Sequence, residues 1–106
     1  MQFDHLALCV DDVSRTVNAL ARFSNRVSVE YADATWAMLD VEGRKLALVT
    51  RGDHPSHAAL RVESIDELAA LASKYMAEIK THRDGSQYFY VSLKKGYALE
   101  FISYPY

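Results

Sequence analysis

Two histidines and one glutamate are the residues in this sequence whose types could support metal chemistry together. His5 opens the phrase HLALCV, His57 opens the phrase HAALRV, and Glu100 lies inside the apolar phrase ALEFI. An ionised carboxylate is costly to bury alone, so Glu100 requires a cation, a hydrogen-bonding partner or solvent. Two imidazoles and one carboxylate form a 2-His-1-carboxylate set, which suits a divalent ion such as Fe, Mn, Zn, Ni or Co and leaves positions open for substrate and water.

The two histidines occupy equivalent places in an internal repeat, whose period of 52 residues is the separation of His5 and His57. The same period also pairs Ala7 with Ala59, Leu8 with Leu60, and Val10 with Val62. Strand-like and helix-like patterns then recur in the same order in both halves. The sequence therefore predicts an α+β fold, in which two βαβββ modules, approximately 1–52 and 53–106, form a cupped mixed sheet within a single domain 1–106.

The expected elements follow from periodicity and capping residues. The first helix should begin at Asp11 or Asp12, either of which can serve as its N-cap. The second helix should begin at Ser64, which can form a capping box with Glu67. Strands are expected at 5–10, 26–32, 35–41, 45–50, 57–62, 77–82, 87–93 and 97–104.

Alternation along the first strand of each module turns both histidines away from the helices. The helix of the first module should cover the wholly apolar face, which leaves His5 on the other face with two small residues. The second module should behave alike. In the first module, the face expected under the helix carries Leu6, Leu8 and Val10, and the opposite face carries His5, Ala7 and Cys9. In the second module, the corresponding faces carry Ala58, Leu60 and Val62, and His57, Ala59 and Arg61.

The repeat supplies the carboxylate only once. Leu48 stands 52 residues before Glu100, and an alignment slip of one residue gives Ala47 instead. Neither residue can bind a metal through its side chain. We therefore expect an open site with three protein ligands rather than a closed site with four.

Composition and charge exclude several classes of function. The chain has 106 residues and a net charge of −2, and its Lys and Arg residues form no basic stripe, so no nucleic-acid partner is expected. The single cysteine, Cys9, permits no intrachain disulfide and fits a reducing compartment. No signal peptide and no apolar run of about 18 residues is visible. The expected setting is the cytoplasm, with no membrane partner.

The phrases FDHLALCVDDV, HAALRVESIDEL and GYALEFISY resemble the vicinal oxygen chelate superfamily, which includes glyoxalases, extradiol dioxygenases, fosfomycin-resistance transferases and bleomycin-resistance proteins. The resemblance covers essentially the whole chain. It implies that His5, His57 and Glu100 stand at the metal-ligand places and that a small oxygen-bearing substrate chelates the metal. The empty fourth place near Leu48 disfavours ordinary glyoxalase I and leaves other lyase or isomerase, dioxygenase and thiol transferase chemistry open.

The resemblance also suggests residues that contact the substrate. Lys80, Ser86 and Tyr90 are candidates for the residues that hold a phosphonate in fosfomycin-resistance enzymes, and His82 for an acid–base histidine. One parity of the strand YFYV must line the cup, so either Tyr88 with Tyr90 or Phe89 with Val91 does so. Further candidates are Cys9, Trp36 and Tyr88. The plain structural alternatives are a solvated turn for His82, core lining for Cys9, and core or interface packing for Trp36, Tyr88 and Tyr90.

Two questions stay open at this level. The chain could be a metal-free binding protein of the antibiotic-sequestering type, although such binders typically lose the metal ligands. The open edges of a cupped sheet favour a homodimer, in which the two chains could exchange modules.

Overall fold

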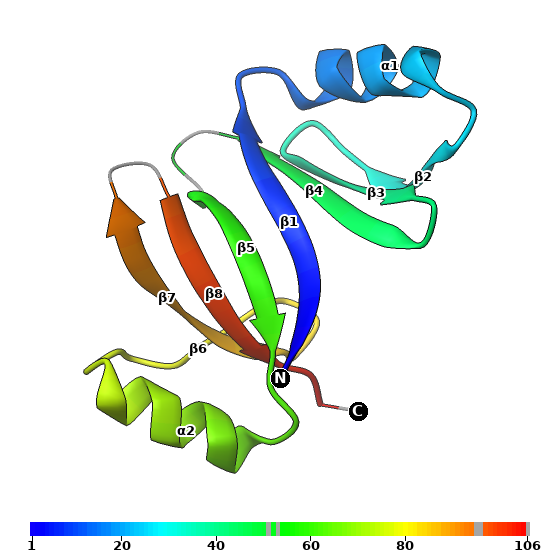
Figure 1. Ribbon diagram of the computed structural model, residues 1–106. Helices are drawn as coiled ribbons and strands as arrows, with labels where there is room; N and C mark the ends of the chain where they lie inside the picture. Colours follow the sequence, from blue (N-terminus) through cyan, green and yellow to red (C-terminus); the bar gives the residue numbers. More distant parts are fainter. Residues whose placement is uncertain (51, 53, 95–96, 106) are drawn as a thin grey trace. The chain divides into compact units, whose positions relative to one another are not determined.

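Two runs of strand, helix and three strands make up the chain, in the order that the repeat predicts. The computed structural model describes residues 1–50, 52, 54–94 and 97–105. The predicted α+β class is confirmed, with a mixed sheet and two helices; the expected strand at 77–82 is reduced to two residues. The elements (Figure 1) are β1 (Gln2–Val10), α1 (Val13–Phe23), β2 (Val27–Ala32), β3 (Trp36–Val41), β4 (Arg44–Thr50), β5 (Ser56–Arg61), α2 (Ile65–Lys74), β6 (Lys80–Thr81), β7 (Gln87–Lys94) and β8 (Tyr97–Ser103).

The chain divides into two compact units. The first-module unit is His5–Ser56, and the second-module unit combines Met1–Asp4 with His57–Tyr106. The boundary thus lies four residues beyond the predicted module boundary at 52, and the first four residues group with the second module. That the whole chain forms a single domain stays a prediction. Among the described residues, no helix is long and apolar enough to span a membrane.

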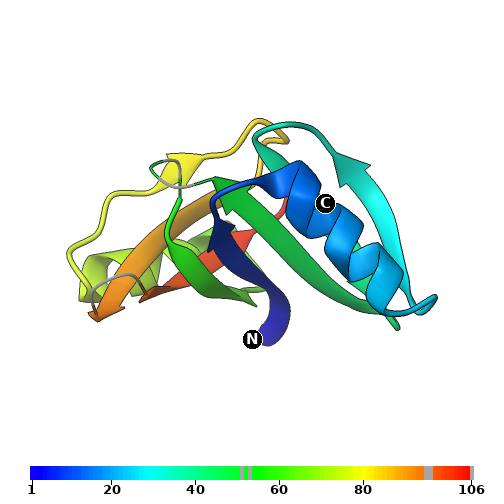
Figure 2. The same ribbon diagram turned by 90° about the horizontal axis from the view of Figure 1, so that it is seen from above.

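The first-module unit has the strand order β2-β3-β4-β1, in which β1 runs parallel to β4 and the other pairs are antiparallel. The N-cap of α1 is Asp12, whose Oδ1 accepts a hydrogen bond from the amide of Arg15 at 3.0 Å. The helix packs against β2, β3 and β4 (Figure 2). The core between them consists of Val13, Val17, Ala37, Leu39 and Leu48.

The apolar face of β1 is less covered than the sequence predicted. Val10 packs against the core, but Leu6 and Leu8 are each 41% exposed. Leu8 pairs in register with the core residue Leu48, so it does lie on the face toward α1. Its exposure arises because α1 packs mainly against β2, β3 and β4. The prediction that the helix buries this whole face is wrong for Leu6 and Leu8.

The second-module unit has the strand order β5-β8-β7-β6, with β7 antiparallel to both of its neighbours. Ser64 caps α2, because its Oγ accepts from the amide of Glu67 at 3.1 Å. The reciprocal bond of the capping box reaches the amide of Glu63 rather than that of Ser64. Apolar residues fill both faces of this part of the sheet: Val62, Leu68, Ala72, Phe89 and Phe101 under α2, and Ala59, Tyr88 and Ile102 on the opposite face.

A polar contact ties the start of β1 to the end of the chain within the second-module unit. The hydroxyl of Tyr104 donates to Oδ2 of Asp4 at 2.5 Å, and the guanidinium of Arg61 lies 4.7 Å from the centre of the Tyr104 ring. Burial raises the pKa of Tyr104, and the hydrogen bond to Asp4 and its charge raise it further, so the hydroxyl remains a donor. The contact fixes the residue immediately before His5.

Tyr104→Phe should destabilise the protein. The variant removes the donor to Asp4 and keeps the ring beneath Arg61, and a hydrogen bond to a charged group contributes about 1.5–3 kcal/mol. We expect the free energy of unfolding, measured by urea denaturation, to fall by about 1.5–3 kcal/mol. Tyr97→Phe, which removes a hydroxyl from a largely exposed side chain, is the control and should change it by less than about 0.5 kcal/mol. Equal effects of the two substitutions would contradict a role for the Tyr104 contact.

Candidate metal centre

Glu100 lies at the middle of β8 and is only 1% exposed. Its neighbours Leu99 and Phe101 pack into the core under α2, so Glu100 points to the opposite face of the sheet. Two imidazoles reach its carboxylate: Nε2 of His57 lies 3.4 Å from Oε1, and Nε2 of His82 lies 2.8 Å from Oε2. The buried carboxylate therefore has the kind of partner that its apolar surroundings require.

His57 is held at the start of β5 on the same face as Glu100. Its side chain is buried, and its ring meets the edge of Tyr90, with ring centres 5.0 Å apart. Tyr90 in turn contacts Tyr88 edge to face at 5.4 Å. Of the two parities of β7, Tyr88 and Tyr90 therefore line this face, while Phe89 packs in the core under α2.

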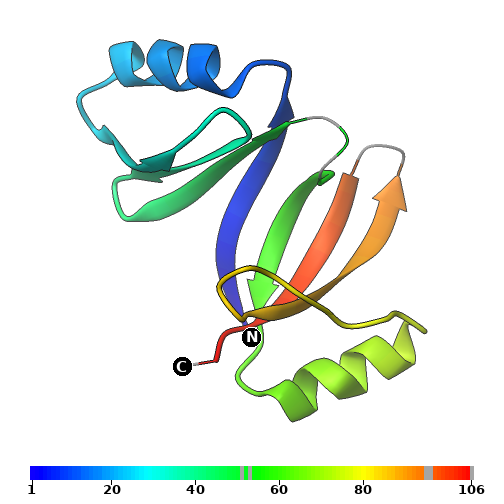
Figure 3. The same ribbon diagram turned by 180° about the vertical axis from the view of Figure 1, so that it is seen from behind.

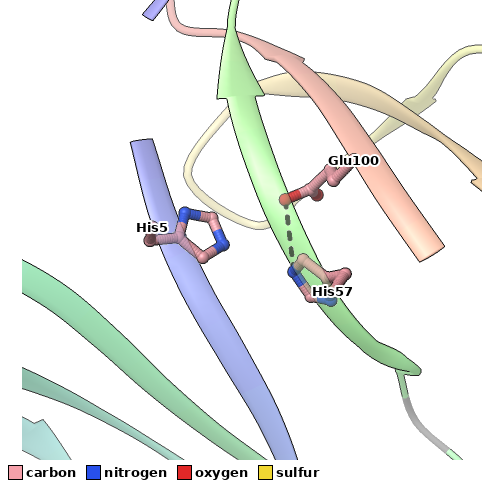
Figure 4. A group of neighbouring side chains, drawn as sticks. All are labelled: His5, His57 and Glu100. Carbon is pink, nitrogen blue, oxygen red and sulfur yellow. Dashed lines mark ion pairs between the residues drawn. The ribbon is translucent and has the colours of Figure 1, made fainter. Parts of the chain in front are cut away.

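His5 is the third side chain of metal-ligand type that the sequence singled out. It follows Asp4 directly along β1, and its side chain is buried like those of His57 and Glu100. Each of these three residues offers one ligand atom, and Figure 4 labels the three side chains. Glu100 and His57 are joined there by the ion pair that the dashed line marks.

The distance between His57 and Glu100 fits joint ligation of a divalent ion. Ligand atoms about 2.1 Å from one ion, at angles between 90° and tetrahedral, lie about 3.0–3.4 Å apart, and opposite ligands about 4.2 Å apart. The 3.4 Å between His57 and Glu100 falls within this range. Nitrogen and carboxylate donors together suit Fe, Mn, Zn, Ni or Co.

His82 reaches Glu100 from a closed turn between β6 and β7. The amide of His82 donates to the carbonyl of Ser86 at 2.8 Å, and the amide of Gly85 donates to the carbonyl of His82 at 3.0 Å. Oδ1 of Asp84 accepts from the amide and the hydroxyl of Ser86 at 2.8 Å and 2.5 Å. Partial burial acts to raise the pKa of Asp84, but these bonds from Ser86 outweigh it and leave the pKa lowered. An ionised Asp84 thus keeps the turn closed.

The remaining candidates from the sequence lie in different places. Ser86 is wholly buried and bonded to Asp84, so it builds the turn, while Lys80 is exposed on β6 opposite Tyr88. Cys9 and Trp36 are both paired with Val49, and so lie on the His5 face of the first-module unit. Trp36 stacks on Tyr31 with ring centres 4.7 Å apart. Sequence reasoning did not find Asp84 or the Asp4–Tyr104 contact; the turn signal DGS at 84–86 was the available hint for Asp84.

The first module has no carboxylate at the place that matches Glu100. α1 and α2 begin 52 residues apart, whereas β4 and β8 begin 53 residues apart. The extra residue lies in the hairpin between β7 and β8, where the register shifts between Ser92 and Lys94. Glu100 therefore aligns with Ala47, as the one-residue slip gives, and Leu48 belongs to the core under α1.

The fold is shared with solved structures, although no family model and no curated protein sequence matches the chain. A glyoxalase/bleomycin resistance protein/dioxygenase superfamily member from Vibrio splendidus 12B01 has a TM-score of 0.68 at 17% identity, over 93% of this chain and 96% of that one. A protein from Legionella pneumophila described as an NAD-dependent benzaldehyde dehydrogenase has a TM-score of 0.66 at 15% identity, over 93% and 96%. A variant of homoprotocatechuate 2,3-dioxygenase from B. fuscum has a TM-score of 0.63 at 16% identity, over 98% of this chain and 34% of that one.

The chain therefore has the glyoxalase/dioxygenase fold, as its resemblance to the superfamily predicted. The three similar structures carry different names at comparable TM-scores. Since one fold can host several chemistries, the function has to be argued from the side chains around Glu100.

The tyrosines beside Glu100 remain protonated over a wide pH range. Burial raises the pKa of Tyr90, and the charge of Glu100 and the neighbouring Tyr88 raise it further. Burial is also the main reason why the pKa of Tyr88 is raised, with the charge of Glu100 second. Both hydroxyls are therefore hydrogen-bond donors at neutral pH.

Tyr90→Phe should make stability less sensitive to alkali. Because the pKa of Tyr90 is raised in the folded state, the unfolded chain, with a value of about 10, loses this proton first as pH rises. The stability associated with the neutral hydroxyl is thus present below about pH 10 and lost above it. Urea denaturation at a series of pH values should show a shallower alkaline fall for Y90F than for the wild type. A difference in phenolate absorbance between the two proteins while both are folded would contradict this assignment.

Proposed function

We propose that this chain is a metal-dependent enzyme that acts on a small oxygen-bearing substrate, and that His5, His57 and Glu100 hold its divalent ion. The observation that carries the proposal is the buried pair of His57 and Glu100, whose Nε2 and Oε1 lie 3.4 Å apart. His5, the third side chain of ligand type, is buried as well. The fold adds support, since a dioxygenase and a member of the glyoxalase/bleomycin resistance/dioxygenase superfamily share it.

Three protein ligands leave coordination positions open for two neighbouring oxygens of a substrate. A divalent ion bound there would supply Lewis-acid stabilisation of negative charge that develops on those oxygens. Tyr88 and Tyr90 would present aromatic surface and protonated hydroxyls next to Glu100. Such a site is compatible with lyase or isomerase, dioxygenase and thiol transferase chemistry.

Metal-free binding of a small molecule is the second candidate. The supporting observation is that His57 and His82 already surround the carboxylate of Glu100, so its burial does not by itself require an ion. Tyr88 and Tyr90 would then provide the aromatic surface that a binding site of this kind uses. Metal affinity separates the two candidates.

Protein stripped of metal should bind a single Co(II) or Mn(II) ion per chain, measured by isothermal titration calorimetry. Loss of a direct ligand should lower metal affinity at least as much as loss of a residue that only contacts a ligand. We therefore expect the Kd for the metal to rise by more than about 100-fold in each of His5→Ala, His57→Ala and Glu100→Ala. His54→Ala, which removes a histidine from outside the proposed ligand set, is the matched control and should bind like the wild type.

Each of the three ligand variants tests one ligand assignment separately from the other two. If the wild-type protein takes up no divalent ion, the enzyme proposal is wrong and metal-free binding is favoured. If only His5→Ala binds as tightly as the wild type, His5 is not a ligand and the other two assignments stand. Circular dichroism of each variant separates lost ligation from lost folding.

We further propose that the chain works as a homodimer in the cytoplasm, with a small molecule as its other partner. The supporting observation for the dimer is the apolar surface of β1, where Leu6 and Leu8 are 41% exposed on one face. A second copy of the chain would cover such a surface through an isologous contact. The cytoplasmic setting is proposed because the single cysteine, Cys9, suits a reducing compartment.

Light scattering at micromolar concentration should give twice the 12.0 kDa of one chain. Leu8→Glu places a charge on the proposed contact and should return the mass to that of one chain. Leu93→Glu, at a residue on β7 that is 58% exposed, is the control and should leave the dimer intact. A wild-type mass of 12.0 kDa would refute the dimer.

A further inference from the structure

His82 lies outside the proposed ligand set, yet its contact with Glu100 is shorter than that of His57. The distances to Glu100 are 2.8 Å from Nε2 of His82 to Oε2 and 3.4 Å from Nε2 of His57 to Oε1. The two histidines thus face different oxygens of one carboxylate. An ionised carboxylate only accepts hydrogen bonds, so an ionised Glu100 takes this bond from the tautomer of His82 that carries its proton on Nε2.

The ring of His82 is held independently of this bond. It stacks on Tyr88 with ring centres 3.6 Å apart and only 5° between the ring planes. Its main chain is fixed by the closed turn, in which it exchanges bonds with Ser86 and Gly85. Figure 3 shows this segment, between β6 and β7, curling over the end of β8. His82 is thus placed by its turn and by Tyr88 as well as by its contact with Glu100.

We propose that His82 is a positioning residue for the proposed metal centre. By holding Oε2 of Glu100, it directs Oε1 toward His57, so that the carboxylate offers the ion one oxygen rather than two. The inference rests on the proposed function, and it assigns His82 to Glu100 instead of to acid–base work on a substrate. A carboxylate that binds through one oxygen leaves one more position open for substrate. Outer-shell partners of this kind typically change metal affinity by 10–100-fold.

Two substitutions separate the hydrogen bond from the stacking. His82→Phe keeps a ring that can stack on Tyr88 and removes the donor, whereas His82→Gln keeps a donor and removes the ring. In a Co(II) titration followed by visible absorbance, H82F should bind about 10–100-fold more weakly than the wild type and show an altered spectrum. H82Q should stay within about threefold of the wild type, well below the usual effect of a lost outer-shell partner. Arg83→Ala, at an exposed residue in the same turn, should bind normally.

Each outcome decides a different point. Wild-type affinity and spectrum in H82F would overturn the positioning role and leave the metal site standing. Equal weakening in H82F and H82Q would also overturn it, because ring packing would then account for the effect.

A wild-type protein that binds no Co(II) would refute the proposed function instead. Nuclear magnetic resonance of the metal-free protein then tests the contact between His82 and Glu100. Glu100→Gln should shift the Nε2 resonance of His82, and an unchanged resonance would overturn the pairing. This comparison needs no substitution at His82, so it also decides the matter if H82F does not fold.

Discussion

A carboxylate buried to 1% exposure between two imidazoles is the constraint on which the rest of the second-module unit depends. Removing such a charge from water costs several kcal/mol, and only well-placed partners offset that cost. β5 supplies His57, the turn after β6 supplies His82, and β7 supplies the two tyrosines that pack around them. The same geometry serves either of the two candidate functions, because it stabilises Glu100 without an ion and leaves ligand-type atoms close enough to take one.

Much of the fold could be predicted because its determinants are local and repeated. Strand and helix periodicity, with Ser64 and an aspartate before α1 as caps, gave the order βαβββ twice. Alternation along β1 and β5 placed the histidines opposite the helix faces, and Ala7 and Ala59 are indeed fully buried beside them. The three residue types for a metal site were visible for the same reason, since each stands at a fixed place in a recognisable strand. Their action as ligands stays a prediction.

The contacts that the sequence did not yield depend on geometry that no local pattern encodes. His82 and Glu100 are 18 residues apart, and the letters THRDGS indicate a turn without showing where its histidine points. Asp4 and Tyr104 are 100 residues apart and meet because both chain ends group with one unit. The exposure of Leu6 and Leu8 is of the same kind: alternation identified their face, but how far α1 extends over that face is a matter of packing.

The asymmetry of the two modules explains how a duplicated fold can carry an unduplicated site. Corresponding residues of the two modules are 52 apart at the helices and 53 apart at the last strand, because the hairpin before β8 contains one extra residue. Glu100 in β8 therefore corresponds to Ala47 in β4. In the first module that place holds a methyl group, and Ala7 is its register partner on β1. The first module therefore contributes one histidine flanked by small side chains, and the second contributes a histidine, a carboxylate and the aromatic residues that support it. Because the repeat accounts only for the histidines, the carboxylate of the proposed metal site comes from the last strand of the second module alone.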